Sequence, residues 1–149
     1  MGVTPLHQAV VSRCGECVER LVNESEIELD ARDSLLMTPL CLATILDDLR
    51  TVEALVSRGS DLEAGDEMDL TPLHHACAYG YLEVVSFLLG NGADPTIAAM
   101  IDDTTPFDQA SSHGHYEVLE KLFEYRSYTS RGSEKAIALA SANGHTRRR

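Results

Sequence analysis

The chain has 149 residues, of which 44% are hydrophobic and 24% charged, and its formal net charge is −12. This mixture predicts one folded domain and excludes a disordered chain. The negative charge argues against binding to nucleic acid or to an anionic membrane surface, because both expose phosphates, and it favours a basic protein partner.

The chain is expected to be intracellular. Residues 1–7 lack the basic start and apolar run of a signal peptide. Apolar runs such as residues 97–101 fall far short of the roughly 20 residues that a membrane span needs. The four cysteines are therefore expected to be reduced thiols in the cytoplasm or nucleus.

A Thr-Pro-Leu motif recurs along the chain. Its copies begin at Thr4, Thr38, Thr71 and, with Phe in place of Leu, Thr105, at spacings of 34, 33 and 34 residues. A Thr side chain can accept a hydrogen bond from a free amide at a helix start, and Pro suits the first helical turn. Each copy therefore predicts the start of a short helix.

A second helix is expected after each first helix. Gly80, Gly114 and Gly144 lie where the first helix should end, and Gly59 and Gly92 suit the C-terminal cap of the second. Apolar residues recur at helical spacing between these glycines, at Val84, Val85, Leu88 and Leu89 and again at Val118, Leu119, Leu122 and Phe123. Neither helix could bury its apolar stripe alone, so stacked helix pairs are predicted.

Residues 71–94 resemble a nearly complete ankyrin repeat, with Thr-Pro-Leu-His-His-Ala at 71–76 and Gly-Ala-Asp at 92–94. The resemblance implies an all-α ankyrin-repeat solenoid of four helix–turn–helix repeats with loop fingers, plus a partial fifth repeat. The expected repeats form a single domain and span residues 4–37, 38–70, 71–104 and 105–134, with the partial repeat at 135–149. Residues that depart from the family pattern are Cys41 and Asp108 in place of His, and Arg13 and Asp47 in place of Gly.

Cys14 and Cys17 form a C-x-x-C motif, which could be a redox pair or half of a zinc site. Alignment with the third repeat places Cys17 on the buried stripe of a second helix and Cys14 in the turn before it. Structural cysteines are therefore expected, and a redox or metal-binding protein that uses this pair stays open as an alternative.

Histidines could also suggest a metal site, since His74 and Cys77 share one helix face. The resemblance instead implies that His7 and His74 form hydrogen bonds between neighbouring repeats. No metal site and no cofactor are expected. No nucleophile–base constellation and no phosphate-binding glycine loop is found, so the chain is not expected to be an enzyme.

The resemblance implies that the loop fingers and the exposed sides of the first helices line one concave groove for a partner. The residues expected to bind it are Leu35, Met37, Ile45, Leu46, Glu67, Met68, Leu70, Ala78, Tyr79, Ile101, Asp102, Ser112 and His113. Large apolar side chains interleaved with acids favour a basic or amphipathic segment of another protein. The alternative is that Leu36, Leu70 and Met100 pack between adjacent fingers.

These patterns predict a non-catalytic protein–protein interaction module, monomeric by itself, that serves as the adaptor or targeting part of a larger protein. A stand-alone inhibitor that occludes its partner is the alternative within the same class. Neither alternative involves nucleic acid or a membrane.

Overall fold

The computed structural model describes residues 2–125, which divide into two compact units, one up to Pro72 and one from Leu73 onward. The helices of the first unit are α1 (Pro5–Val11), α2 (Gly15–Val22), α3 (Pro39–Ile45) and α4 (Leu49–Ser57). Those of the second unit are α5 (Pro72–Tyr79), α6 (Leu82–Gly90), α7 (Pro106–Ser112) and α8 (Tyr116–Glu124). Between residues 2 and 125 there is no strand, which confirms the all-α prediction. The expected partial fifth repeat lies outside the described residues.

Threonine caps the start of α1, α3 and α7 for the reason that the sequence suggests. The side-chain oxygen of Thr4 accepts the N–H of His7 at 3.4 Å, and that of Thr38 accepts the N–H of Cys41 at 3.2 Å. Thr105 does the same for Asp108 at 3.3 Å. Proline follows each of these threonines in the first turn, where its missing N–H leaves no bond unmade.

The turn between the two helices of each pair needs a left-handed residue. Gly80 and Gly114 have φ angles of 75° and 74°, a conformation that glycine adopts without cost. Arg13 and Asp47 occupy the same position in the first two repeats and adopt φ angles of 55° and 53°. The turn therefore keeps its shape after glycine is lost, at a conformational cost to the fold.

Two of the second helices, α4 and α6, end in a glycine-dependent cap, as predicted. Gly59 and Gly92 have φ angles of 94° and 96° just after the last helical turn. The next amides fold back onto the helix, from Ser60 to the carbonyl of Leu55 at 3.2 Å and from Ala93 to that of Leu88 at 3.0 Å. Such paired bonds satisfy carbonyls that the helix end would leave free.

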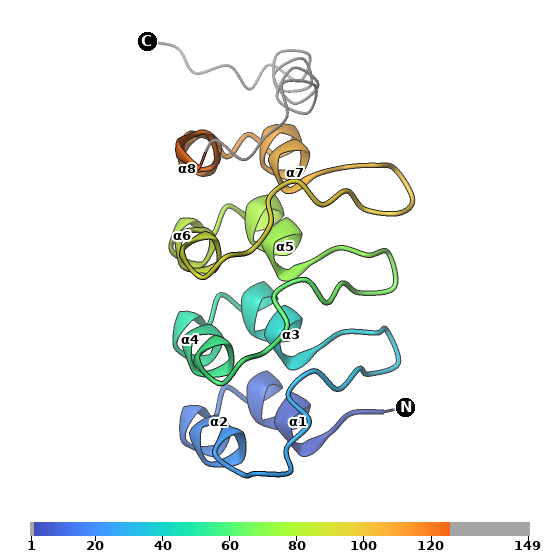
Figure 1. Ribbon diagram of the computed structural model, residues 1–149, viewed down its shortest axis with the longest axis vertical. Helices are drawn as coiled ribbons and strands as arrows, with labels where there is room; N and C mark the ends of the chain where they lie inside the picture. Colours follow the sequence, from blue (N-terminus) through green and yellow to red (C-terminus); the bar gives the residue numbers. More distant parts are fainter. Residues whose placement is uncertain (1, 126–149) are drawn as a thin grey trace. The chain divides into compact units, whose positions relative to one another are not determined.

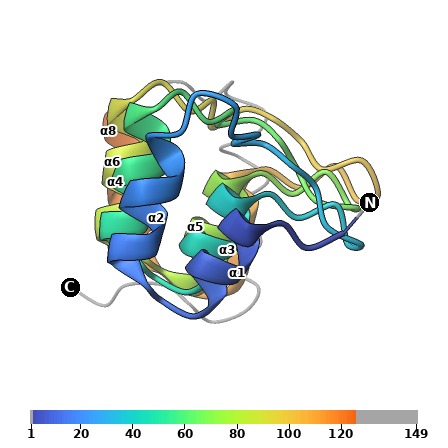
Figure 2. The same ribbon diagram turned by 90° about the horizontal axis from the view of Figure 1, so that it is seen from below.

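In the first unit, the two helix pairs stack side by side (Figure 1). α1 packs on α3 and α2 packs on α4, and Leu6, Leu40 and Leu55 are completely buried between them. Two arginines also join the pairs through backbone carbonyls. Arg13 donates to the carbonyl of Leu46 at 2.7 Å, and Arg58 donates to that of Val22 at 2.9 Å. Seen along the stack, α1 and α3 form one layer and α2 and α4 the other (Figure 2).

In the second unit, α8 packs on both α6 and α7. The predicted stripe of α6 is buried in full, at Val84, Val85, Leu88 and Leu89. The stripe of α8 is buried at Val118, Leu119 and Leu122, whereas Phe123 remains 45% exposed. Its ring lies edge-on to the buried ring of Phe107, with centroids 4.8 Å apart, so Phe123 covers the core rather than joining it.

In the first three repeats, one side chain of the first helix is bonded to a carbonyl of the loop that follows the helix pair. In His7, Nδ1 accepts the N–H of Thr4 at 3.2 Å, which leaves Nε2 to donate to the carbonyl of Met37 at 2.9 Å. His74 Nε2 lies 3.1 Å from the carbonyl oxygen of Thr104. Both hydrogen bonds therefore reach the last residue of the histidine's own repeat, 4–37 or 71–104, and not the neighbouring repeat that the resemblance implied.

Cys41 replaces histidine in the second repeat and keeps this contact. Its Sγ donates to the carbonyl of Ala64 at 3.4 Å, and the side chain is completely buried. Asp108 replaces histidine in the fourth repeat and turns back instead, accepting the N–H and the hydroxyl of Thr105, both at 2.9 Å.

We predict that Asp47→Gly stabilises the protein by up to about 1 kcal/mol, because glycine removes the cost of the left-handed turn. The neighbouring change Asp48→Ala should destabilise it by about 1 kcal/mol, because the Asp48 carboxylate caps α4 by accepting the N–H of Thr51 at 3.2 Å. Urea unfolding of both variants measures the two changes. A loss of stability in Asp47→Gly would contradict the argument.

A second prediction concerns alkaline pH. Burial raises the pKa of the Cys41 thiol to about 11. The neutral Cys41 thiol therefore makes its full contribution to the free energy of unfolding below the ordinary thiol pKa of about 9. This contribution, roughly 3 kcal/mol in total, is lost as pH rises from about 9 through about 11. Cys41→Ser, whose hydroxyl can still donate to Ala64, should lack this loss. Urea titrations of both proteins across that range test it, and parallel pH profiles would refute it.

Candidate protein-binding surface

The loop between α2 and α3 is a finger whose tip is fixed by Asp33. The Asp33 carboxylate accepts the amides of Leu35 and Met37, both at 2.9 Å, and its own N–H donates to the carbonyl of Met37 at 3.1 Å. Leu36 takes the left-handed position of the turn, with φ 57°. These bonds hold the Leu35 side chain at a defined place on the tip.

The loop between α4 and α5 repeats this arrangement. The Asp66 carboxylate accepts the amides of Met68 at 2.9 Å and Leu70 at 3.1 Å, and Asp69 is the left-handed residue, with φ 59°. The two fingers of the first unit are bonded to each other. Arg32 donates to the carbonyl of Gly65 at 2.8 Å, and the N–H of Glu67 donates to the carbonyl of Leu35 at 3.3 Å.

The finger of the second unit lies between α6 and α7 and is closed in a related way. The N–H of Ala99 donates to the carbonyl of Thr104 at 2.8 Å, and the Asp102 carboxylate accepts the hydroxyl of Thr104 at 2.7 Å. Asp103 has φ 58°. In Figure 1 this loop projects away from the helices of its own unit, as the fingers of the first unit project from theirs.

Most predicted binding residues of the first unit are accessible. Leu35 is 55% exposed and Met68 43%, and Glu67 beside Met68 is also exposed. Ile45, Leu46 and Leu70 are half-buried.

Met37 differs from this group, because its side chain is only 8% exposed and lies in the core. The prediction that Met37 meets a partner is therefore wrong, since the N–H and carbonyl of Met37 close the finger and its side chain packs inward.

The second unit exposes a similar mixture. Ile101 is 73% and Tyr79 52% exposed, and Asp102 and His113 are exposed as well. Ala78 and Ser112 are half-buried. The ring of Tyr79 stacks on that of Tyr81 with centroids 5.5 Å apart, which orients it before any partner binds.

The alternative interpretation of the sequence is that Leu36, Leu70 and Met100 pack between adjacent fingers, and Leu70 is half-buried. Met100 is 80% exposed and Leu36 is 38% exposed, so neither is buried. Met100 directly precedes Ile101, and the adjacent acids Asp102 and Asp103 mark this stretch as a loop tip. That signal could have placed Met100 with the accessible residues.

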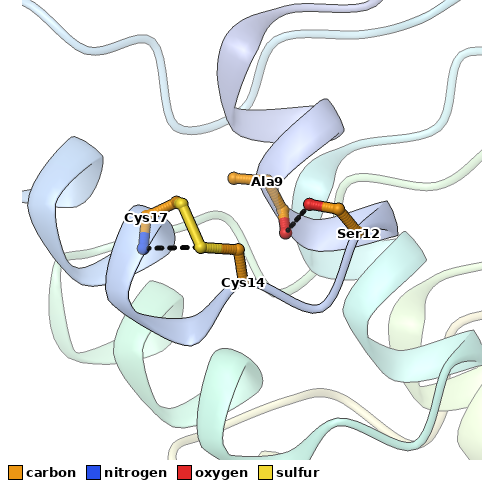
Figure 3. The surroundings of a disulfide bond; sticks show 4 residues. All are labelled: Ala9, Ser12, Cys14 and Cys17. Atoms are coloured by element: carbon orange, nitrogen blue, oxygen red, sulfur yellow. Dashed lines mark hydrogen bonds between the residues drawn. A yellow bond between two sulfur atoms is a disulfide. The ribbon is translucent and has the colours of Figure 1, made fainter.

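The cysteine motif also differs from expectation (Figure 3). Cys14 and Cys17 are joined by a disulfide, so the expectation of four reduced thiols is wrong for this pair. Cys17 is exposed rather than buried on the helix stripe, because it belongs to the first repeat, where no earlier helix in the described residues covers α2. Cys41 and Cys77 are free thiols and are completely buried.

The described residues contain no cluster of His, Cys, Asp or Glu that could bind a metal ion. Within the same range no helix has the length and apolar character to cross a membrane. His115 Nε2, like His7 and His74, contacts a backbone carbonyl, that of Ala78 at 2.9 Å. The fingers expose apolar side chains beside carboxylates. Internal hydrogen bonds hold the backbone of these fingers in place.

Comparison with known proteins agrees with this architecture. The family model described as ankyrin repeats (3 copies) matches residues 6–99 and 65–137. Neurogenic locus notch homolog protein 1 of Xenopus laevis is 34% identical over 107 residues, which are 72% of this chain and 4% of that protein. Palmitoyltransferase AKR1 of Lachancea kluyveri is 36% identical over 83 residues, 54% of this chain and 11% of the enzyme. Protein phosphatase 1 regulatory subunit 27 of Mus musculus is 34% identical over 93 residues, 62% of this chain and 60% of that subunit.

The chain thus spans less than two thirds of the length of each of these relatives. Ankyrin repeats are protein–protein interaction modules and are generally non-catalytic, although they also occur in proteins such as the palmitoyltransferase. The repeating helix pairs, the capping threonines, the fingers and the family match lead to one conclusion: this chain belongs to the ankyrin-repeat family.

Proposed function

We propose that this chain binds a basic, partly apolar segment of a partner protein through its fingers and first helices, as the adaptor or targeting part of a larger protein. The observation that carries the proposal is the exposure of large apolar side chains at finger tips and helix ends, above all Leu35, Met68, Tyr79 and Ile101. Loop tips are usually polar, and clustered apolar surface beside charge favours a protein contact.

The proposed surface is made of residues on ordered backbone. In the first unit it comprises Leu35, Ile45, Leu46, Glu67, Met68 and Leu70, and in the second unit Ala78, Tyr79, Ile101, Asp102, Ser112 and His113. Asp33 and Asp66 fix the tips of the first unit before any partner arrives. Less conformational entropy is then lost on binding, which raises affinity without further contacts.

The acidic charge supports a basic segment. Glu67 and Asp102 are exposed beside the apolar residues, and the chain as a whole has a formal charge of −12. Such a field speeds the encounter with a positive partner and disfavours a negative one. We place the module in the cytoplasm or nucleus, where buried thiols such as Cys41 and Cys77 stay reduced, and we propose that it is a monomer by itself.

A stand-alone inhibitor that occludes its partner is the second candidate. It is favoured by the relative named as a regulatory subunit of protein phosphatase 1, of which the matched region covers 60%. The two candidates differ in outcome. An inhibitor lowers the activity of the captured partner at saturation, whereas an adaptor leaves that activity unchanged.

We predict that the double change Met68→Ala/Tyr79→Ala weakens partner binding by a few kcal/mol, because exposed apolar anchors carry most of the affinity at such surfaces. The partner is captured from native cells with the wild-type chain, and its Kd is measured for both proteins by calorimetry. Glu53→Ala/Glu83→Ala is the control, since both residues are exposed on second helices. An unchanged Kd in the Met68/Tyr79 variant, with circular dichroism like the wild type, would end this assignment.

We further predict that Glu67→Gln/Asp102→Asn slows association several-fold at low salt and has less effect on dissociation, because rim charges act mainly on encounter. Stopped-flow association at two salt concentrations measures both rates. The salt dependence should become shallower in the variant than in wild type. Equal slopes in the two proteins would contradict a basic partner while leaving the apolar contact intact.

A further inference from the structure

The Cys14–Cys17 disulfide lies at the start of α2 (Figure 3). Cys14 is the N-cap residue and is half-buried, and Cys17 is in the first turn and exposed. At the position of Cys17 in the second repeat, Thr51 is only 2% exposed, because α4 packs on α2. Within residues 2–125, the first repeat therefore exposes a position that the second repeat buries.

This disulfide does not join distant parts of the fold. Its loop holds only residues 14–17, and the backbone there is already fixed by other bonds. The N–H of Cys14 donates to the carbonyl of Ala9 at 3.1 Å, and the N–H of Val18 donates to that of Cys14 at 3.0 Å. A cross-link stabilises a protein mainly by closing a long loop of the unfolded chain, so this short one contributes little to stability.

The two sulfur atoms differ in how well each would hold a negative charge. The N–H of Cys17 donates to Cys14 Sγ at 3.3 Å, and this sulfur lies at the N-terminus of α2, where the helix dipole favours anions. A thiolate at Cys14 is therefore stabilised, whereas Cys17 is the more exposed residue of the pair. An incoming thiolate is expected to attack Cys17 and displace Cys14.

A shallow depression of about 360 Å³ adjoins the exposed sulfur. It is lined by Glu16, Cys17, Arg20, Leu21 and Glu24. Two carboxylates and one guanidinium give this lining a net negative charge, on a chain that is itself acidic. A small thiol that carries an ammonium group would be attracted to it, and one that carries a carboxylate would be repelled.

We propose that the Cys14–Cys17 pair is a thiol–disulfide exchange site that reacts at Cys17 with small aminothiols. The aminothiolate attacks Cys17 Sγ and forms a mixed disulfide there, and the electron pair of the broken S–S bond leaves with Cys14 as a thiolate. A second aminothiolate then attacks the aminothiol sulfur of the mixed disulfide, which releases the Cys17 thiolate and a small disulfide. The two aminothiols together lose two electrons, one from each, and the protein disulfide gains these two electrons.

The first experiment tests the site with the full oxidised chain. Cysteamine is added, thiols are blocked at timed points, and mass mapping locates them. Cys14 and Cys17 should appear together, and Cys41 and Cys77 should remain unmodified until the protein is denatured, because both are buried. With cystamine, the variant Cys14→Ser should accumulate a mixed disulfide at Cys17. Loss of the disulfide only on denaturation, or no mixed disulfide in Cys14→Ser, would overturn the proposal.

The second experiment tests the preference for an ammonium group. Exchange rates with cysteamine, neutral 2-mercaptoethanol and anionic 3-mercaptopropionate are measured for wild type and for Glu16→Gln/Glu24→Gln. For each thiol, the exchange rate of the variant is divided by that of the wild type, and this ratio removes the thiol's own reactivity. The variant should react about twofold to fivefold more slowly with cysteamine, the size expected for exposed charge pairs, and no more slowly with 2-mercaptoethanol.

Glu83→Gln/Glu117→Gln is the matched control, because it removes the same charge from exposed residues of α6 and α8. The exchange rate of this control variant should be close to that of the wild type for all three thiols. Equal ratios for cysteamine and 2-mercaptoethanol in the Glu16/Glu24 variant would overturn the assignment of the aminothiol class. Equal cysteamine losses in both variants would likewise overturn it, by showing that only the total charge matters.

Discussion

The bond from a first-helix side chain to the carbonyl of the following loop is the contact on which the rest of the architecture depends. A short helix pair buries only one stripe of each helix and cannot be stable alone. His7 and Cys41 each join a helix to the loop that leads to the next pair, at Met37 and Ala64. The loop is thereby held against the helix that precedes it, and its finger projects from a fixed base. Without this contact, the apolar side chains of the tips would have no defined position.

The same bond explains why histidine serves better than its replacements. An imidazole has two nitrogens, and His7 uses one for the N–H of Thr4 and the other for the carbonyl of Met37, so it caps its own helix while it reaches the next loop. Cys41 has one weak donor, which bonds to the loop at the carbonyl of Ala64. Asp108 has only acceptors and bonds to Thr105, the cap of its own helix. The repeats thus keep one backbone plan while the strength of the contact varies along the chain.

Much of this fold could be predicted from the sequence, because a motif that recurs at a fixed spacing indicates the same local structure in each repeat. The helix starts at Thr4 and Thr38 and the buried stripe of α6 follow from rules about caps and periodicity. The errors arise where burial depends on the neighbours of a residue. Cys17 matches the register of Val84, yet it lies in the first repeat and is exposed. Met37 lies beside exposed finger residues, yet its side chain points into the core.

The candidate surface was harder to predict than the fold for a related reason. Sequence gives the order of residues on a loop, whereas the Asp33 and Asp66 turns decide which side chains point outward.

The open face of α2 has a practical consequence for protein engineering. A designer who fuses another repeat ahead of Thr4 would lay a new helix over Cys17, as α2 lies over Thr51. Such a fusion would shield the sulfur pair from solvent, so the presence of a repeat ahead of Thr4 would govern the reactivity of the pair.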